Sequence, residues 1–282
     1  MMIKNSNIAD KIGFIQGRLS KVENNRIQIF PVRNWKAEFQ VACVNDINKI
    51  EWTIDSETIS ENPLINSETL TEILELMNHY SIQVPSVTCD YFMEKPPWQE
   101  SERDLEDVLT KIMNGMHLLN STKLVIPLVD NSSLSNSKYI TTVINFFERI
   151  NPKIIQNNIQ ICFESDFSPQ DLADFIKKFP KNNYGINYDM GNSASLGYLP
   201  YEEFELYGSR IINVHIKDRL LYGKSVPLGE GSADFESVFR CLKSTNYNGN
   251  YILQTARDAQ GNHLSALLKY RSMVINWITK DE

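Results

Sequence analysis

Short apolar runs alternate with amphipathic segments along the whole chain. Continuous apolar runs are typical of strands buried in a parallel sheet, and apolar residues at helical spacing predict the helices between them. Eight such units in 282 residues favour a closed (β/α)8 TIM barrel over an open sheet. The predicted strands are residues 12–16, 48–54, 82–88, 122–128, 159–164, 184–189, 211–216 and 250–255, and the predicted helices are residues 34–45, 67–80, 101–120, 136–157, 168–179, 200–208, 233–245 and 260–279.

The chain contains no linker, break in composition or low-complexity tract, so we expect one domain over residues 1–282. Its least regular segments each follow a predicted strand, which in a barrel places them at the catalytic face. They are residues 17–33, 55–66, 89–100, 129–135 and 218–232. Segment 89–100 combines aromatic residues with paired prolines, and it is either a lid over a site or an ordinary surface loop.

Composition narrows the function classes. A net charge of −7 argues against general affinity for nucleic acid or a membrane surface, which needs a basic face, although a few local Arg and Lys residues suffice for a small anion. The four cysteines are scattered without a C-x-x-C pair, which predicts reduced thiols in a cytoplasmic protein and no thiolate metal site. No signal peptide and no apolar run of the ~20 residues that span a bilayer is recognisable.

Four polar residues come at the ends of the last four predicted strands: Glu164, Asp189, His215 and Gln254. Because a barrel of parallel strands brings these ends together at one face, we expect the four side chains to converge. Two carboxylates and an imidazole with an amide oxygen form a plausible ligand set for one divalent metal ion. Taken singly, each residue also fits a helix cap, an ion pair or a packed core group. The other three histidines, His79, His117 and His263, fall in or beside helical patterns and are interpreted as structural or surface residues.

Several motifs together resemble the sugar phosphate isomerase/epimerase group of xylose isomerase-like TIM barrels. They are IGFIQGRLS (12–20), IEW (50–52), FES (163–165), NYDMGNSASLG (187–197), NVHIKDR (213–219), PLGEGSADF (227–235) and YILQTARD (251–258). The resemblance implies a metal ion (Mn, Zn, Co or Mg) held by Glu, Asp, His and a final Glu. The first three map onto Glu164, Asp189 and His215, whereas the fourth position holds Gln254.

Gln254 departs from the family pattern in a way that affects catalysis. In family epimerases the first and last Glu work from opposite faces of the substrate, one removing a proton and the other returning it. The resemblance therefore gives Glu164 the role of base, but Gln254 can only ligate through its carbonyl oxygen. Either another residue supplies the proton, or the reaction uses one face, or the catalytic role has changed or been lost. Glu51, inside the second strand, is a candidate carrier, and the alternative is a buried ion pair with an Arg or Lys.

The resemblance also suggests a set of substrate-binding residues: Arg18, Glu51, Asn192, Lys217, Asp218, Arg219, Glu230 and Arg257. Arg219 and Arg257 are candidates for holding a phosphate or another polar end of the substrate. Asp218 is expected to orient a ligand or bind a hydroxyl. Glu230 lies in a Gly-Glu-Gly turn and either reaches a substrate hydroxyl or belongs to an ordinary loop. Asn192 stands where several relatives use a His to bind substrate.

The function that follows is a metal-dependent isomerase or epimerase of a small sugar or sugar phosphate, acting through an enediolate. Lyases of the same fold, of the inosose or dehydroshikimate dehydratase type, are an alternative. A non-catalytic sugar-binding protein is another, motivated by Gln254. The tri-zinc endonucleases of this fold are disfavoured, because the chain has only four His. The resemblance further implies pairing into a homodimer.

Overall fold

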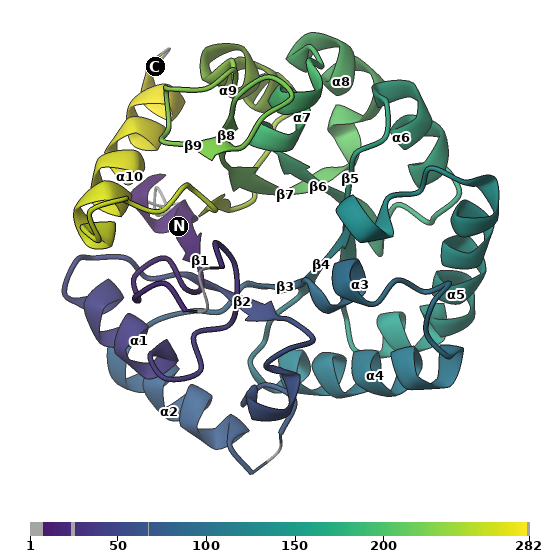
Figure 1. Cartoon of the computed structure of the whole chain (residues 1–282), viewed down its shortest axis with the longest axis horizontal. Coiled ribbons are helices and arrows are strands. Elements are labelled where there is room, and N and C mark those ends of the chain that lie inside the picture. Colours follow the sequence, from purple (N-terminus) through teal and green to yellow (C-terminus); the bar gives the residue numbers. More distant parts are fainter. Residues whose placement is uncertain (1–7, 24–25, 67, 281–282) are drawn as a thin grey trace, which may run out of the picture.

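The computed structural model describes residues 8–23, 26–66 and 68–280. Eight parallel strands close into a barrel in the order β1-β10-β7-β6-β5-β4-β3-β2 (Figure 1). They are β1 (Ile12–Ile15), β2 (Ile50–Ile54), β3 (Ser86–Cys89), β4 (Lys123–Leu128), β5 (Gln160–Ser165), β6 (Tyr184–Asp189), β7 (Ile211–Ile216) and β10 (Tyr251–Leu253). The predicted strands and the TIM-barrel fold are thereby confirmed.

Helices surround the barrel as a ring (Figure 1). The eight predicted from sequence are α1 (Trp35–Cys43), α2 (Leu70–Tyr80), α4 (Glu102–Leu118), α5 (Ser137–Gln156), α6 (Pro169–Ile176), α8 (Pro200–Tyr207), α9 (Phe235–Ser244) and α10 (His263–Thr279). At α6, the Ser168 hydroxyl accepts a hydrogen bond from the Asp171 N–H, and Pro169 occupies the first turn. Most observed helices are a few residues shorter than predicted, and position 67 of the second lies outside the described residues.

Additional short elements occur in the connections. They are helices α3 (Tyr91–Glu94) and α7 (Met190–Leu196), the antiparallel pair β8 (Asp218–Arg219) and β9 (Ser225–Val226), and the 3-10 turns η1 (Ile8–Lys11), η2 (Ile59–Glu61), η3 (Asp130–Ser132) and η4 (Gly208–Arg210). The α3, α7 and β8–β9 elements follow β3, β6 and β7, so they lie over the carboxyl ends of the strands. They shape the face at which barrel enzymes place their sites.

The hydrophobic core lies between the barrel and its helices, with aromatic side chains at its centre. Phe163 on β5 packs against Phe147 of α5 and Phe175 of α6, with ring centroids 5.0 and 5.2 Å apart. On the opposite side, Trp52 of β2 contacts Trp35 of α1 at 5.6 Å. Because side chains alternate along a strand, residues next to these apolar ones face the barrel axis. That interior is where the polar groups of the site gather.

Among the described residues, none of the helices has the length and apolar character needed to cross a bilayer. The four cysteines, Cys43, Cys89, Cys162 and Cys241, all lie within the described residues and are free thiols. Burial raises the pKa of the Cys162 thiol to about 12, so this sulfur stays protonated at neutral pH.

Candidate active site

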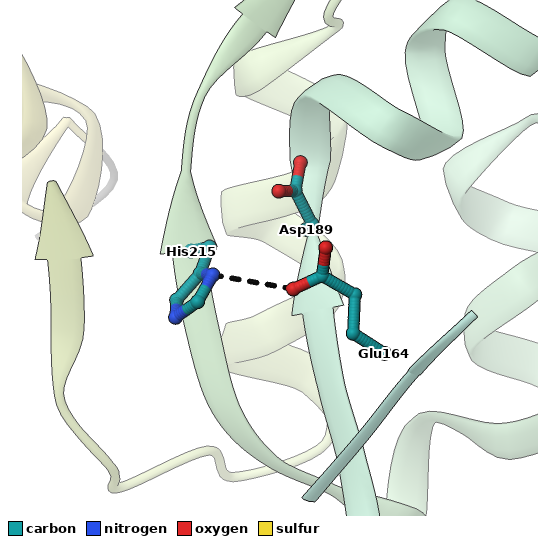
Figure 2. Close-up of side chains that lie close together, drawn as sticks. All are labelled: Glu164, Asp189 and His215. Carbon is teal, nitrogen blue, oxygen red and sulfur yellow. Dashed lines mark ion pairs between the residues drawn. The ribbon is translucent and has the colours of Figure 1, made fainter. Parts of the chain in front are cut away.

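Glu164, Asp189 and His215 meet at the carboxyl ends of β5, β6 and β7. All three are buried, and their metal-competent atoms lie within 4.8 Å of one another. The register of β6 and β7 places Asp189 directly beside His215. Figure 2 shows His215 facing Glu164, with the Asp189 carboxylate on the strand beside them. Three of the four residues predicted to converge therefore do so.

A buried carboxylate beneath this cluster fixes the orientation of His215. Glu51 on β2 is fully buried, and its Oε1 lies 2.7 Å from Nε2 of His215. The hydroxyls of Ser86 and Thr88 each donate to Glu51 over 2.6 Å, and Asn213 Nδ2 donates over 3.2 Å. With Nε2 tied to Glu51, the ring directs Nδ1 toward Glu164 Oε2, 3.3 Å away. A carboxylate on the far nitrogen is a common way to orient a metal-binding histidine.

In the metal-free protein, the positive charge of His215 and the negative charges of Glu51 and Glu164 stabilise one another. Burial opposes the charged imidazolium, but the carboxylates of Glu51 and Glu164 outweigh it and raise the pKa of His215 to about 10. Burial likewise opposes the charged forms of these two carboxylates, yet contact with His215 lowers the pKa of both. For Asp189 burial prevails, and the pKa is raised although the Lys217 ammonium is close.

Two further side chains hold the Glu164 carboxylate in place. Asn187 Nδ2 donates to Oε2 and Asn192 Nδ2 donates to Oε1, each over 2.7 Å. Asn213 Nδ2 in turn donates to Asn187 Oδ1 over 2.9 Å. Asn187 and Asn213 were not among the predicted site residues. Their sequence signal is spacing, since each stands two residues before a predicted ligand and so points to the same side of its strand.

Lys217 lies among the oxygens of the site. Its Nζ is 3.1 Å from Asp189 Oδ2, 3.4 Å from Asn192 Oδ1 and 3.3 Å from Gln254 Oε1. Its position depends on Gly191, because a Cβ there would come within 2.8 Å of the Lys217 side chain. These contacts bring the amide oxygen of Gln254 to the site, as predicted, through a lysine that it shares with Asp189.

A cavity of about 560 Å³ opens above this cluster. Its lining includes four of the predicted site residues besides the cluster: Asn192, Lys217, Arg219 and Gln254, together with Glu164 itself. Arg219 Nη1 donates to Asn192 Oδ1 over 2.9 Å. The size is within the range of about 300–1,000 Å³ common for small-molecule sites.

The remaining predicted substrate-binding residues lie outside this lining. Arg18 and Arg257 donate to backbone oxygens, Arg18 Nε to Thr255 over 2.8 Å and Arg257 Nη1 to Ser20 over 2.8 Å. Burial, with the Arg257 charge, lowers the pKa of Arg18 to about 9. The two arginines thus join the segment after β1 to the segment after β10, and their burial and backbone partners favour a structural role.

Asp218, Glu230 and Glu51 do not line the cavity either. The Asp218 carboxylate accepts from the backbone N–H groups of Gly229, Gly231 and Ala233 at 2.9–3.1 Å. It approaches so closely that a Cβ on Gly231 would lie 2.2 Å from Asp218 Oδ1. Glu230 projects from this turn as an exposed residue. Glu51 lies in a buried ion pair, but its partner is His215 and not the Arg or Lys expected in the alternative to a role as proton carrier.

Acidic residues that sequence reasoning missed form much of the cavity wall. Asp90, Glu94, Asp130 and Asp166 line it together with Glu164. Glu94 belongs to α3, which lies within the expected lid segment 89–100. This segment is anchored on α5, because Trp98 stacks on Tyr139 with centroids 4.0 Å apart and planes 10° from parallel. It therefore forms part of the cavity rim.

The cluster has the chemistry of a divalent metal site. His215 Nδ1 is buried and forms an ion pair with Glu164 Oε2 over 3.3 Å, without a hydrogen bond of good geometry. Once deprotonated, this nitrogen has a lone pair that is suited to an ion. Glu164 and Asp189 keep unused lone pairs on oxygens that each accept few hydrogen bonds.

A family model described as xylose isomerase-like TIM barrel matches residues 48–271. The chain belongs to this family. The match covers the strands from β2 to β10 and so includes the whole cluster of Glu164, Asp189 and His215. The resemblance inferred from the sequence motifs is thereby confirmed.

The curated proteins to which the chain is similar include a dehydratase and an epimerase. Inosose dehydratase of Clostridium botulinum (strain Alaska E43 / Type E3) is 20% identical over 244 residues, which cover 73% of this chain and 80% of that protein. L-ribulose-5-phosphate 3-epimerase UlaE of Salmonella paratyphi C (strain RKS4594) is 33% identical over 87 residues, 30% of this chain and 31% of that protein. These similarities support an enzyme of the isomerase/epimerase type in general terms.

Solved structures share the fold across the chain. The structure of the IOLI protein with a binding zinc atom has a TM-score of 0.72 at 14% identity, with 96% of this chain and 98% of that chain covered. At this identity the similarity shows the architecture alone.

Proposed function

We propose that this protein is a metal-dependent sugar isomerase or epimerase that removes a proton from the carbon next to a carbonyl. The observation that carries the proposal is the convergence of Glu164, Asp189 and Nδ1 of His215 next to a cavity of about 560 Å³, which Glu164 lines. The family assignment and the similarity to an epimerase support the same reaction class.

Each side chain has a defined part in this chemistry. Glu164, Asp189 and His215, with the amide oxygen of Gln254, would hold a divalent ion (Mn, Zn, Co or Mg), which polarises a carbonyl and favours an enediolate. Glu164 is the general base, and Asn187 and Asn192 hold its carboxylate in a single orientation. Glu51 fixes the ring of His215 from below.

The charge of the cavity favours a neutral sugar over a sugar phosphate. Five carboxylates line it, against the two cations Lys217 and Arg219. Lys217 already faces the Asp189 carboxylate, and Arg219 donates to Asn192 and to the Gly223 carbonyl. Arg257, the other arginine predicted to hold a phosphate, donates to the Ser20 backbone oxygen, and Arg18 donates to the Thr255 backbone oxygen. A phosphate dianion would meet a predominantly negative wall, whereas hydroxyl groups can donate to these carboxylates.

Deuterium uptake from D2O, followed by NMR, tests the function without knowledge of the product. D-tagatose, D-allulose, L-ribulose 5-phosphate and an inosose are incubated with protein loaded with each of the four ions. We expect deuterium next to the carbonyl of a neutral sugar, loss of exchange on chelation, and recovery on adding the ion back. Exchange that survives thorough metal removal, or no exchange with any ion and sugar, contradicts the proposal.

Dehydration of an inosose is the second candidate. It is favoured by the inosose dehydratase relative, of which the match covers 80%. An enolate formed by the same proton removal would then expel a hydroxyl, so exchange would be accompanied by loss of water and an unsaturated product that absorbs in the ultraviolet. A non-catalytic sugar-binding protein would instead bind a sugar without exchange or product.

Metal binding is expected to release about one proton per ion at pH 7. The pKa of His215 is raised to about 10, so its Nδ1 carries a proton in the metal-free protein and must lose it to become a ligand. Calorimetric titration in buffers of different ionisation enthalpy measures this proton directly. The affinity should fall as the pH falls. Proton release close to zero would show that His215 is not a ligand or is neutral before binding.

A further inference from the structure

Asp90 differs from the other carboxylates of the cavity. It follows β3 directly, it lines the cavity, and only 7% of the residue is exposed. No described residue hydrogen-bonds to its carboxylate, and the α3 helix that begins after it is not capped by this side chain. Glu94, by contrast, accepts bonds from Arg26 Nη1 and from the backbone and hydroxyl of Ser56. A buried carboxyl without a partner is costly when ionised.

The barrel topology places Asp90 across the barrel from His215. In the closed ring, β3 is four strands from β7 in either direction, so Asp90 and His215 come from opposite sides. Glu164 on β5 is two strands from β3, with β4 residue Pro127 lining the cavity between them. Asp90 and Glu164 therefore reach the same cavity from different strands, and Glu164 stands midway between Asp90 and His215 along the ring.

Several charged groups face Asp90 from the neighbouring elements. Burial first, and then the carboxylates of Glu164 on β5, Glu94 on α3 and Asp55 after β2, raise the pKa of Asp90 to about 7, against the opposing charge of His215 on β7. The carboxyl consequently holds a proton for part of the time at neutral pH. An acid with a pKa near the working pH is suited to both giving and taking a proton.

Other groups in or near the cavity fit this task less well. The amide of Gln254 neither releases nor accepts a proton at neutral pH. Glu51 is fully buried in its pair with His215 and does not line the cavity. Glu94 is engaged with three donors, and Lys217 with the oxygens of Asp189 and Gln254.

We propose that Asp90 is the second proton carrier of the site, in the place that a Glu at position 254 would otherwise serve. The inference rests on the proposed function. Glu164 takes the proton as the C–H bond breaks and its electron pair enters the enediolate. The Asp90 carboxylic acid then gives its proton to the same carbon from the other face, forming the new C–H bond and leaving a carboxylate. Exchange with water reprotonates Asp90 and deprotonates Glu164, so no other reactant is needed.

An Asp90→Asn variant separates inversion from exchange. Glu164 can still remove a proton and return a deuteron to the same face, so starting sugar should gain deuterium at a rate within a few-fold of wild type. The opposite epimer should form about 10²-fold more slowly or worse. Both rates are read from one NMR time course in D2O with a ketose that the wild type exchanges. The proposal is overturned if the variant forms the opposite epimer as fast, relative to exchange, as wild type does. It is also overturned if the rates of inversion and exchange fall together and KM rises, because Asp90 would then only bind a substrate hydroxyl.

Asp130→Asn is the matched comparison. Asp130 also lines the cavity, is exposed, and has a positive φ of 52°, a conformation that Asn tolerates. Asp130→Asn removes one carboxylate charge, as Asp90→Asn does, so its ratio of inversion to exchange should equal that of wild type. If this ratio falls as it does in the Asp90 variant, cavity charge is responsible and the proposal fails.

A measurement without substrate keeps the two proposals distinguishable. The carboxyl carbons of selectively 13C-labelled Asp are titrated in metal-free protein, and the Asp90 signal is assigned by its absence from Asp90→Asn. A midpoint near 7 supports the proposal, while one near the ordinary value of 3.8 overturns it. Failure of the proposed function would appear instead as wild-type protein that exchanges none of the sugars.

Discussion

Glu164→Gln is expected to lower the rate of deuterium exchange and of turnover by about 10²–10⁴-fold, the range typical for loss of a general base. The variant keeps the size of the side chain, but it removes the charge that takes the proton and one of the oxygens that Asn187 and Asn192 now contact. It also weakens the attraction of the cluster for a divalent ion. Exchange and product formation are measured with the sugar that wild type accepts.

The two roles of Glu164 are separated by saturating metal. If the residue only helped to hold the ion, excess ion would restore activity, whereas a base cannot be replaced in this way. Glu203→Gln is the control, since Glu203 is a buried carboxylate on α8 that accepts bonds from Tyr188, Ser193 and Tyr207 outside the proposed machinery. It should lower thermal stability while exchange persists. A Glu164→Gln protein that exchanges within a few-fold of wild type would assign the base elsewhere.

The fold could be predicted because its strands are encoded locally. The runs around Phe163 and Val214 are rich in buried apolar residues, as required when helices cover the outer face of a parallel barrel. The short additions were missed for the opposite reason. Helix α7 depends on Asp189 capping the Asn192 N–H, and the β8–β9 pair depends on contacts around Asp218, neither of which has a periodic signal.

Only those site residues that stand at the ends of strands could be predicted from the sequence. Asp189 and His215 are recognisable because a polar group closes an apolar run, and the shared edge of the barrel brings them together. The contact between Glu51 and His215 joins residues 164 positions apart and is decided by how the barrel closes. Asp90 stands at the start of an irregular segment, where a carboxylate is ordinarily a cap or a surface group. Its burial in the cavity wall depends on three-dimensional packing and has no signal in the sequence.

Glu51→Ala is expected to have the largest effect on stability, a loss of about 3–5 kcal/mol in the free energy of unfolding, since it breaks a buried pair by removing one partner. Four donors lose their common acceptor: His215, Ser86, Thr88 and Asn213. All four donors are buried in the barrel interior, away from bulk water, so they are left without an acceptor. Thermal and chemical unfolding of metal-free protein measure the loss, and metal affinity should fall with it because the His215 ring is no longer held.

The charge contribution has a pH signature that Glu51→Gln isolates. The folded pKa of His215 is raised from 6.5 to about 10, so its stabilisation is fully present below pH 6.5 and disappears as the pH rises toward 10. The folded pKa of Glu51 is lowered from 4.5, so its stabilisation is present above that pH and disappears as the pH falls. The stability difference between wild type and Glu51→Gln should therefore be greatest between about pH 4.5 and 6.5 and should shrink toward pH 10.

Glu38→Gln is the matched control for this pH dependence. Glu38 is also a fully buried carboxylate, but it accepts from the backbone of Gly17 and Leu19 and has no histidine partner. Burial raises the pKa of Glu38, so its ionised form is destabilised in the folded protein, whereas contact with His215 lowers the pKa of Glu51. Glu38→Gln therefore shows what the loss of a buried carboxylate without a histidine partner does to the pH dependence. If the Glu51→Gln difference were independent of pH, the pair would act through shape and neutral hydrogen bonds alone. The measured pH dependence of this stability difference therefore decides whether His215 is held as an imidazolium between two carboxylates. In that state His215 must lose a proton before it can bind a metal ion.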